Sequence, residues 1–368
     1  MLSPALAQHA RDSVQPRLPR HSPLAVLTRD GLVEGVHYGS LIATGPDGVT
    51  LLEAGDPLTP FYPRSALKPL QAVALLRAGL DIPAELLALT AASHSGAAVH
   101  RNGALRILEL HGLTPGALEN TSDLPYGTSE RAEWLSEAGK PSQLAQNCSG
   151  KHAAMAATCV INGWPVKGYL NPEHPLQQLV AKTVRDLTGE EPAGLSTDGC
   201  GTPLFALTLR GIATAFGRLA AATELAAAGT PSENAEAAVA HAMRRHPEMV
   251  AGEGRDVTEL MRLVPGLLAK DGFEGVQLVG LPDGRGIAVK ISDGGDRARM
   301  PVTVRVLEAL DVDTATLAGI ATASVLAGGR PVGILQAADF LSAGVVPARS
   351  KNSSARNAWQ TSPSNTPN

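Results

Sequence analysis

The sequence predicts an α/β protein in which strands from both ends of the chain form one antiparallel sheet around a large helical insertion. Strand-like apolar runs lie at 23–28, 33–43, 49–52, 275–281, 286–291 and 332–335. Asp-Gly pairs separate the first three runs, which is typical of hairpin turns. Terminal strands that flank a helical middle pack most simply as one sheet, with the helices as an inserted lobe.

The middle of the chain, from 65 to about 245, has a mainly helical pattern. The predicted helices lie at 65–78, 84–91, 100–112, 129–138, 150–162, 175–188, 203–226 and 232–244. Two more are predicted among the returning strands, at 301–310 and about 315–326. His100, His111 and His241 fall within helical patterns, so we expect them at the surface or in packing rather than as ligands.

These patterns predict a single domain over 23–345 with two lobes. The sheet lobe comprises about 23–63 plus 265–345, and the helical lobe about 64–264. The seam between two lobes is a common place for a cleft, and Ser65 lies where the chain leaves the sheet for the helices. Residues 1–22 are polar and irregular and residues 346–368 are rich in Ser, Asn and Pro, so we expect a flexible extension and a disordered tail.

The composition is that of an ordinary globular protein, and it excludes several classes of function. Hydrophobic residues make up 44% and charged residues 18% of the 368 positions, with a formal net charge of −4. Because the sequence has no basic stripe and no run of eighteen apolar residues, we expect no nucleic-acid partner and no membrane span. The N-terminal segment lacks the apolar core of a signal peptide, so we expect a cytoplasmic protein. The three cysteines do not suggest a disulfide framework.

The helix predicted to begin near Ser65 carries the first candidate site. Ser65 and Lys68 are three residues apart, and residues at this spacing share one face of a helix. Pro69 is tolerated only near a helix start, which places the first turn close to Ser65. A desolvated lysine can activate a neighbouring serine, so the pair predicts Ser65 as a nucleophile and Lys68 as its base. The alternative is that Ser65 only caps the helix and that Lys68 is solvated.

Two loops place a cysteine beside glycines: Asn147-Cys-Ser-Gly-Lys-His152 and Asp198-Gly-Cys-Gly-Thr-Pro203. Two thiolates from separate loops suit a soft metal such as zinc, and the Cys148-x-x-Lys151 spacing can place a thiolate and an amine on one side of a turn. The alternative is a pair of ordinary buried thiols. A phosphate loop is excluded, because no glycine stands five residues before Gly150 and no Ser or Thr follows Lys151.

Ser93 and Lys270 are weaker candidates when they are judged from pattern alone. The stretch Ala92-Ser-His-Ser-Gly96 follows an apolar run and precedes a predicted helix, which fits either a helix cap or a second hydroxyl in the cleft. Lys270 stands just before a returning strand, where the pattern favours a solvated lysine in a turn.

Six motifs together resemble those of the L-asparaginase II family, and they occur in the family's order between about 24 and 340. They are Arg64-Ser65-x-x-Lys68-Pro-x-Gln71, Ser93-His94-x-Gly96, Asn147-Cys-Ser-Gly-Lys-His152, Asp198-Gly-Cys-Gly-x-Pro203, His246-Pro-Glu-Met-Val-Ala-Gly252 and Lys270-x-Gly-x-Glu-Gly275. The resemblance implies an α/β fold like that of the serine β-lactamases, so the 23–345 domain would be a catalytic one.

The resemblance also implies an amidohydrolase that converts L-asparagine to L-aspartate and ammonia through a Ser–Lys acyl-enzyme. It implies two catalytic pairs, Ser65 with Lys68 and Ser93 with Lys270; we expect Ser65 to be acylated and the second pair to relay a proton to the departing ammonia. It implies one Zn²⁺ per subunit, bound by Cys148, Lys151 and Cys200, that positions substrate rather than activating water. It assigns substrate-binding or supporting roles to Arg64, Lys151, His152 and Asp198. A homodimer is expected from the resemblance alone.

The motifs depart from the family at Ala97, where Glu is common, and at Ala154, where Gly is usual. The first departure concerns substrate contacts more than the fold. Three alternatives remain open at this point. A glutaminase would share the motifs. A β-lactamase or D,D-peptidase would need a Lys-Thr-Gly strand, which the sequence lacks, and a Ser-Asp-Asn loop, whereas Leu124 follows Ser122-Asp123. A non-catalytic amide-binding sensor would be expected to lose a Ser or a Lys.

Overall fold

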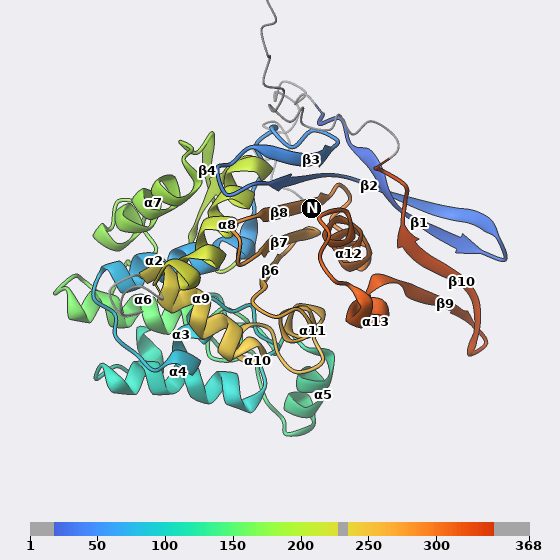
Figure 1. Ribbon diagram of the computed structural model, residues 1–368. Helices are drawn as coiled ribbons and strands as arrows, with labels where there is room; N and C mark the ends of the chain where they lie inside the picture. Colours follow the sequence, from blue (N-terminus) through green and yellow to red (C-terminus); the bar gives the residue numbers. More distant parts are fainter. Residues whose placement is uncertain (1–17, 227–234, 342–368) are drawn as a thin grey trace, which may run out of the picture.

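One antiparallel sheet joins the two ends of the chain in the computed structural model, which describes residues 18–226 and 235–341 (Figure 1). Its strands are β1 Ser22–Arg29, β2 Leu32–Thr44, β3 Thr50–Ala54, β6 Leu268–Gly272, β7 Val276–Gly280, β8 Gly286–Ile291, β9 Ala323–Ala327 and β10 Arg330–Ala337. They follow the order β6-β7-β8-β2-β1-β10-β9, and β3 pairs with β2. The prediction that the terminal strands share one sheet is confirmed.

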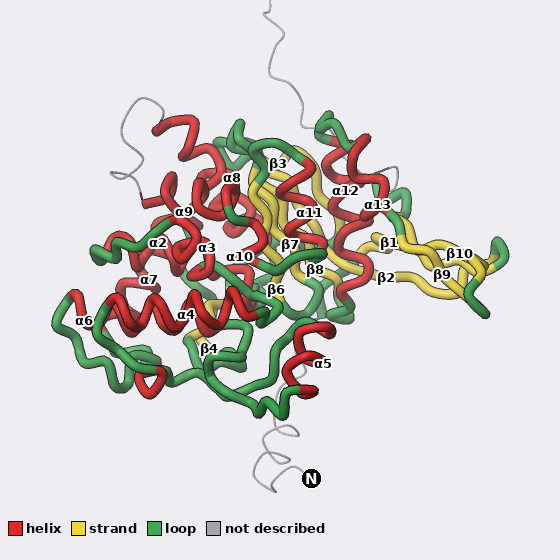
Figure 2. Tube along the Cα trace, turned by 90° about the horizontal axis from the view of Figure 1, so that it is seen from below, coloured by secondary structure: helices red, strands yellow, loops and turns green. Residues whose placement is uncertain are grey.

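The helical lobe lies between β3 and β6 in the sequence and to one side of the sheet in space (Figure 2). Its helices are the 3₁₀ turn Arg64–Leu67, α2 Lys68–Arg77, α3 Ala84–Thr90, α4 Ala98–Leu110, α5 Thr128–Ser136, α6 Ser149–Ile161, α7 Pro175–Thr188, α8 Leu209–Ala226, α9 Ala235–Arg245, α10 Pro247–Val250 and α11 Asp256–Leu263. A small separate sheet pairs β4 Gly194–Thr197 with β5 Pro203–Ala206. Two helices follow β8, namely α12 Arg299–Ala309 and α13 Ala318–Ala321.

The two faces of the main sheet are covered by different helices. Gly280 and Gly286 lie very close to α8. A Cβ added to Gly280 would lie 2.2 Å from the backbone oxygen of Phe216, and one added to Gly286 would lie 1.8 Å from that of Ala213. Gln277 has the opposite parity on β7, and its Oε1 accepts from Arg299 of α12 at 2.6 Å. Successive side chains of a strand point to opposite faces, so α8 and α12 sandwich the sheet. The buried run Leu41-Ile42-Ala43 in β2 is apolar because both faces are covered.

Two segments that were predicted as helix form strands instead. The helix expected from 203 begins only at Leu209, because 203–206 pairs with β4 as a strand. The helix expected at 315–326 is limited to short turns up to Ala321, because Ala323–Ala327 pairs with β10. In both cases strand pairing elsewhere in the fold overrides a local helical pattern.

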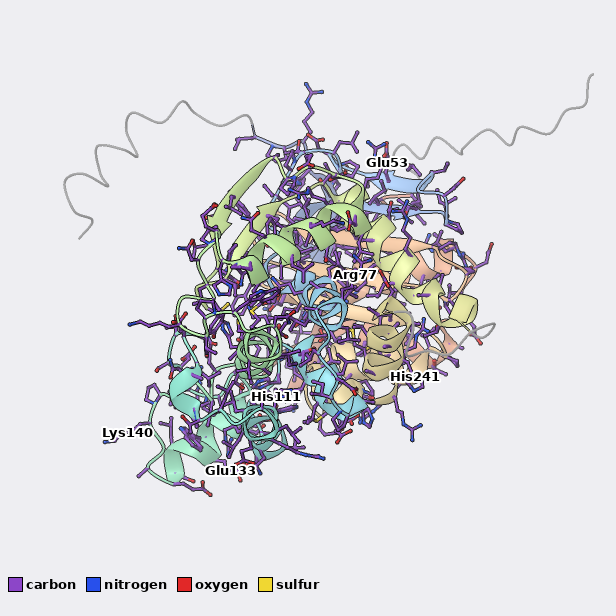
Figure 3. All side chains as sticks on the ribbon, turned by 90° about the vertical axis from the view of Figure 1, so that its left-hand side faces the viewer. Glu53, Arg77, His111, Glu133, Lys140 and His241 are labelled. Carbon is purple, nitrogen blue, oxygen red and sulfur yellow. The ribbon has the colours of Figure 1, made fainter. Side chains whose placement is uncertain are left out.

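Other expectations have mixed outcomes. Lys270 is not in a solvated turn: it lies on β6, a strand that the sequence pattern missed. His241 of α9 is exposed (Figure 3), and His100 is buried and stacks on His94 with ring centroids 4.9 Å apart; both agree with the expected surface or packing roles. The expected helix start at 232, most of the expected extension (1–17 of 1–22) and the tail at 346–368 lie outside the described residues. Within those residues, no helix has both the length and the apolar character needed to cross a membrane.

The close approach of α8 to the sheet predicts a strict requirement for glycine at position 286. The atoms that a new methyl group would meet belong to the backbone of α8, so no side chain can move aside. We expect Gly286→Ala to lower the free energy of unfolding by about 2 kcal/mol or more, measured by urea or thermal unfolding. Gly319→Ala is the matched control, because a Cβ there meets nothing within 4 Å. Equal stability of the two variants would contradict this account of the interface.

Candidate active site

Ser65 is held where the chain passes from the sheet into the helical lobe. It lies in the 3₁₀ turn Arg64–Leu67, directly before α2, with 5% of its surface exposed. Arg64 has a φ of +56°, a left-handed conformation that costs free energy in a residue other than glycine. The turn packs directly on β6, since a Cβ on Gly272 would lie 2.5 Å from the carbonyl oxygen of Pro63. The backbone around Ser65 is therefore held against the sheet.

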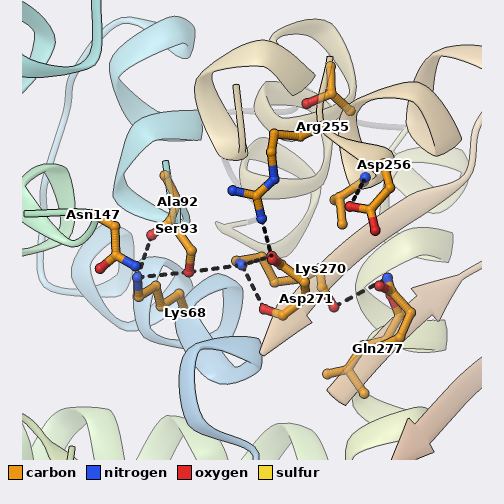
Figure 4. A network of polar contacts seen from close by, with 12 residues as sticks. Lys68, Ala92, Ser93, Asn147, Arg255, Asp256, Lys270, Asp271 and Gln277 are labelled. Carbon is orange, nitrogen blue, oxygen red and sulfur yellow. Dashed lines mark hydrogen bonds and ion pairs between the residues drawn. The ribbon is translucent and has the colours of Figure 1, made fainter. Parts of the chain in front are cut away.

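The Lys68 amine is buried and points away from the start of its own helix. Its Nζ donates to the Ala92 carbonyl oxygen at 2.6 Å and to Ser93 Oγ at 3.0 Å (Figure 4). It also donates to Cys148 Sγ at 3.1 Å. Among the hydrogen bonds of the described residues, none joins Ser65 Oγ to Lys68 Nζ. The i, i+3 spacing would place the two side chains together on a helical surface. The acceptors that follow α3 (Ala92 and Ser93) and the one that precedes α6 (Cys148) draw the Lys68 amine toward Ser93 instead.

Ser93 lies after α3 and receives a second lysine from the sheet. Its backbone N–H donates to the Val250 carbonyl oxygen at 3.0 Å, which fixes the loop. Lys270 Nζ donates to Ser93 Oγ at 3.0 Å, the same distance as Lys68 Nζ. The hydroxyl thus bridges two amines from different lobes. Ser93 belongs to both lysines rather than to Lys270 alone.

Lys270 is fully buried on β6, the edge strand of the sheet beside the helical lobe. Burial lowers the pKa of its amine from 10.5 to about 8, and the positive charge of Lys68 acts in the same direction. The carboxylate of Asp271 opposes both, because a negative charge favours the ammonium form. A lysine with a pKa near neutrality can exchange protons with a substrate at physiological pH.

The two cysteine loops converge beside Lys68. Lys151 Nζ donates to Cys200 Sγ at 3.2 Å and to Thr202 Oγ1 at 2.9 Å. The side chains of Cys148 and Cys200 interact, which raises the pKa of Cys148 and, with the Lys151 amine, lowers that of Cys200 against the effect of burial. Burial and the Lys151 charge lower the pKa of His152 to about 4, so its ring is neutral.

This donor set can be tested for its fit to a metal. Within residues 18–226 and 235–341, no three His, Cys, Asp or Glu side chains form a group that could hold a metal ion. The predicted set consists instead of two sulfur atoms and one lysine nitrogen, and all three side chains are buried. His152, next to this set in the sequence, is buried, and its side chain interacts with Cys200. Two convergent sulfurs with a nitrogen donor fit a soft divalent cation such as Zn²⁺.

A cavity of about 220 Å³ lies beside Ser65 and the two cysteine loops. The predicted site residues in its lining are Arg64, Ser65, Cys148, Asp198 and Cys200. Arg64 Nε donates to Asp198 Oδ1 at 2.8 Å across the cavity wall, so one positive and one negative charge face the space. Ser93 lines an adjoining smaller space. Lys151 and His152 are fully buried, and neither is among the residues that line the cavity.

The model of the L-asparaginase II family matches residues 25–337, which is most of the chain. The chain belongs to the L-asparaginase II family. The family indicates an amidohydrolase that acts on a small amide, and the match begins in β1 and ends in β10, so it spans the whole sheet and the inserted lobe.

No curated protein sequence matches this member of the asparaginase II family. Among solved structures it is similar to Mglu in its native form, with 16% identity, a TM-score of 0.40 and coverage of 79% of this chain and 69% of that one. It is also similar to a putative β-lactamase from Bacteroides dorei (15%, 0.40, 73% and 93%) and to a β-lactamase from Mycobacterium bovis (15%, 0.33, 74% and 94%).

Sequence reasoning missed several residues of the family member's site. Tyr126, Asn147 and Phe273 line both the main cavity and the smaller space beside Ser93. Asn147 and Thr202 stand inside motifs that the sequence analysis quoted, so their positions were available as a signal. Tyr126 lies in a loop without a motif, and only the tertiary structure brings it to the site.

We expect the hydrogen bond between Tyr169 and His152 to stabilise this asparaginase II family member. The buried Tyr169 hydroxyl lies 2.8 Å from His152 Nδ1 and accepts from the Glu119 backbone N–H at 3.1 Å. Tyr169→Phe leaves both groups unpaired in the interior, so we expect the free energy of unfolding to fall by about 1–3 kcal/mol. Urea unfolding measures this, with Tyr38→Phe as the control because Tyr38 is 49% exposed. An unchanged stability for Tyr169→Phe would contradict the role.

Proposed function

We propose that the protein hydrolyses the side-chain amide of L-asparagine to L-aspartate and ammonia through an acyl-enzyme formed on Ser65. One observation carries the proposal: the amines of Lys68 and Lys270 converge on the Ser93 hydroxyl beside a cavity that Ser65 lines. A serine with two lysines and a second hydroxyl supplies a nucleophile, a base and a proton relay within one site. The family match supports an amide substrate.

The cavity also supports an amino acid as substrate. A free amino acid carries a carboxylate and an ammonium group, and the cavity wall presents the Arg64 guanidinium and the Asp198 carboxylate. We propose that Arg64 binds the α-carboxylate and Asp198 the α-ammonium, which leaves the side-chain amide toward Ser65. Ion pairs of this kind fix orientation more than they add affinity.

The proposed reaction has two stages. Ser65 Oγ attacks the amide carbon while Lys68, acting as base, takes the Ser65 proton, so that a tetrahedral adduct forms. For this step the Lys68 amine must exchange its contact with Ser93 Oγ for one with Ser65 Oγ. Lys270 in its ammonium form donates a proton through Ser93 to the amide nitrogen, so that the C–N bond breaks and ammonia leaves. Lys68 then passes the Ser65 proton through Ser93 to Lys270, which returns both amines to their starting forms. Water attacks the resulting ester as Lys68 takes a proton from it, and aspartate is released when Lys68 gives that proton to Ser65 Oγ.

Turnover tests the assignment of Ser65. We expect Ser65→Ala and Lys68→Ala each to abolish ammonia release from L-asparagine, by about 10³-fold or more, because they act as one unit. The double variant should be no worse than either single variant for the same reason. L-Glutamine is assayed in parallel, since the motifs also fit a glutaminase.

A trapping experiment locates the acyl group. After quenching with a slow amide substrate, mass spectrometry should show the adduct on the peptide that contains Ser65. An adduct on the Ser93 peptide would overturn the assignment and exchange the roles of the two serines. A wild-type protein that releases no ammonia from asparagine or glutamine would refute amide hydrolysis and favour a binding role.

We also propose that Cys148, Lys151 and Cys200 hold one Zn²⁺ per subunit. Bound there, zinc would supply a Lewis-acidic contact that orients the substrate near Ser65 rather than a nucleophilic water. The proposal is supported by two buried sulfurs and a buried amine in one cluster. Lysine must be deprotonated to ligate, so occupancy should fall as the pH is lowered.

Metal analysis of protein purified without chelator tests the zinc site. We expect about one zinc per chain, and a loss of most of it in Cys148→Ser. Cys159→Ser is the matched control, because Cys159 is a buried thiol on α6 away from the two motif loops. Zinc-free wild-type protein, or equal zinc in both variants, would count decisively against the site.

We further propose a homodimer. Strands β1, β2, β9 and β10 form an end of the sheet that carries exposed apolar side chains, among them Leu32, Val33 and Leu326. Exposed apolar residues on an uncovered sheet favour association with another chain. Light scattering should give a mass near that of two chains of 38.0 kDa each; a mass near that of one chain would refute the dimer.

A further inference from the structure

Asp271 lies beside the reacting groups, although no role has been given to it. It is the variable residue of the Lys270-x-Gly motif, and its side chain is largely buried. Lys270 Nζ donates to Asp271 Oδ1 at 2.5 Å and to the Asp271 carbonyl oxygen at 2.7 Å (Figure 4). The third contact of the same amine is Ser93 Oγ at 3.0 Å. Three acceptors thus fix the Lys270 ammonium, and two of them belong to Asp271.

The carboxylate of Asp271 is itself fixed from the other side. Its Oδ2 accepts from Arg255 Nη2 at 3.1 Å. Arg255 precedes α11, and its guanidinium lies over the Tyr126 ring, 5.0 Å from the centroid. The ring lines the cavity. One carboxylate oxygen therefore holds the catalytic amine while the other is anchored to a residue packed at the cavity wall.

Neighbouring elements supply the remaining charges around this pair. The charge of Lys68, on α2, acts on Lys270, and the charge of Arg299, on α12, acts on Asp271. Arg299 is itself bonded to Asp256 at 3.1 Å, to Asp296 at 3.0 Å and to Gln277 Oε1 at 2.6 Å. The carboxylates of Asp256 and Asp296 are therefore occupied by Arg299. Among the hydrogen bonds and ion pairs of the described residues, Asp271 is the only carboxylate bonded to Lys270.

The charges act on Asp271 and Lys270 in opposite directions. Burial alone would raise the pKa of the Asp271 carboxyl, but Lys270, Arg299 and Arg255 hold it well below its usual range. Asp271 is therefore ionised at neutral pH. Its negative charge raises the pKa of Lys270 against the lowering effects of burial and of Lys68. Without that charge, the ammonium form of Lys270 would be lost at lower pH.

We propose that Asp271 is a positioning residue whose carboxylate, anchored by Arg255, holds the Lys270 ammonium against the Ser93 hydroxyl. The catalytic consequence rests on the proposed amide hydrolysis, in which Lys270 gives its proton through Ser93 to the leaving ammonia. The geometric part, a carboxylate that fixes the amine and its charge, stands without it.

The pH profile of kcat/KM for asparagine tests the catalytic part. The protonated form of Lys270 exists below its pKa, so wild-type activity should decline as the pH rises through about 8. Asp271→Asn keeps the shape but removes the charge, so this decline should move to lower pH by about 1–3 units. Asp271→Glu restores the charge and should return the decline toward the wild-type position, with a lower kcat because the carboxylate is displaced.

Asp256→Asn is the matched control. It removes a carboxylate of the same network that is bonded to Arg299 and not to Lys270, so the decline should stay at the wild-type pH. A decline that stays in place in Asp271→Asn, or that moves equally in Asp256→Asn, overturns the inference. If Asp271→Asn does not yield folded protein, Asp271→Ser removes the same charge and is measured in its place.

A second readout does not depend on activity. Lysine labelled with ¹⁵N at Nζ reports its ionisation by NMR, and the Lys270 signal is assigned as the one absent from Lys270→Met. The Lys270 pKa should be lower in Asp271→Asn than in the wild type; an unchanged pKa overturns the inference. Wild-type protein that shows no amide hydrolysis refutes the proposed function, and the NMR titration then decides the role of Asp271 alone.

Discussion

Two buried lysine amines meet at one serine hydroxyl, and the rest of the site is arranged to make this possible. Each ammonium group removed from water loses several kcal/mol of hydration unless it gains partners. The Lys68 amine donates to a carbonyl oxygen, a hydroxyl and a sulfur. The Lys270 amine donates to the same hydroxyl and to the carbonyl and carboxylate oxygens of Asp271. Like charges so close together favour deprotonation of one of them.

The same requirement explains the neighbouring charges. The buried Lys151 amine lies against Cys200, whose thiol is shifted toward the thiolate by Cys148 and Lys151. The buried Asp271 carboxylate is balanced by Lys270 and Arg255. Removing one member leaves another buried charge without its partner, which is costlier than the loss of a surface ion pair.

The topology brings these groups together because β6 is an edge strand. The chain leaves the sheet after β3, turns through Ser65, builds the helical lobe and returns at β6 beside the same turn. Lys270 therefore faces residues that are more than a hundred positions earlier in the sequence. Because β6 pairs on one side only with β7, its other side is open to the loop of Ser93. A central strand would have had a neighbouring strand in that position.

The sequence by itself determined the sheet of terminal strands, the helical insertion, the helix that begins near Ser65 and the motif residues of the family. These follow from local patterns: alternation, turn dipeptides and spacing within a few residues. It assigned Lys68 to Ser65, because only the i, i+3 neighbour is visible along the chain. The tertiary structure turned Lys68 toward Ser93, moved Lys270 from a turn onto β6, and placed Asp271 and Arg255 around it. Those outcomes depend on burial and on partners distant in sequence, since a buried amine is directed by the acceptors that the fold provides.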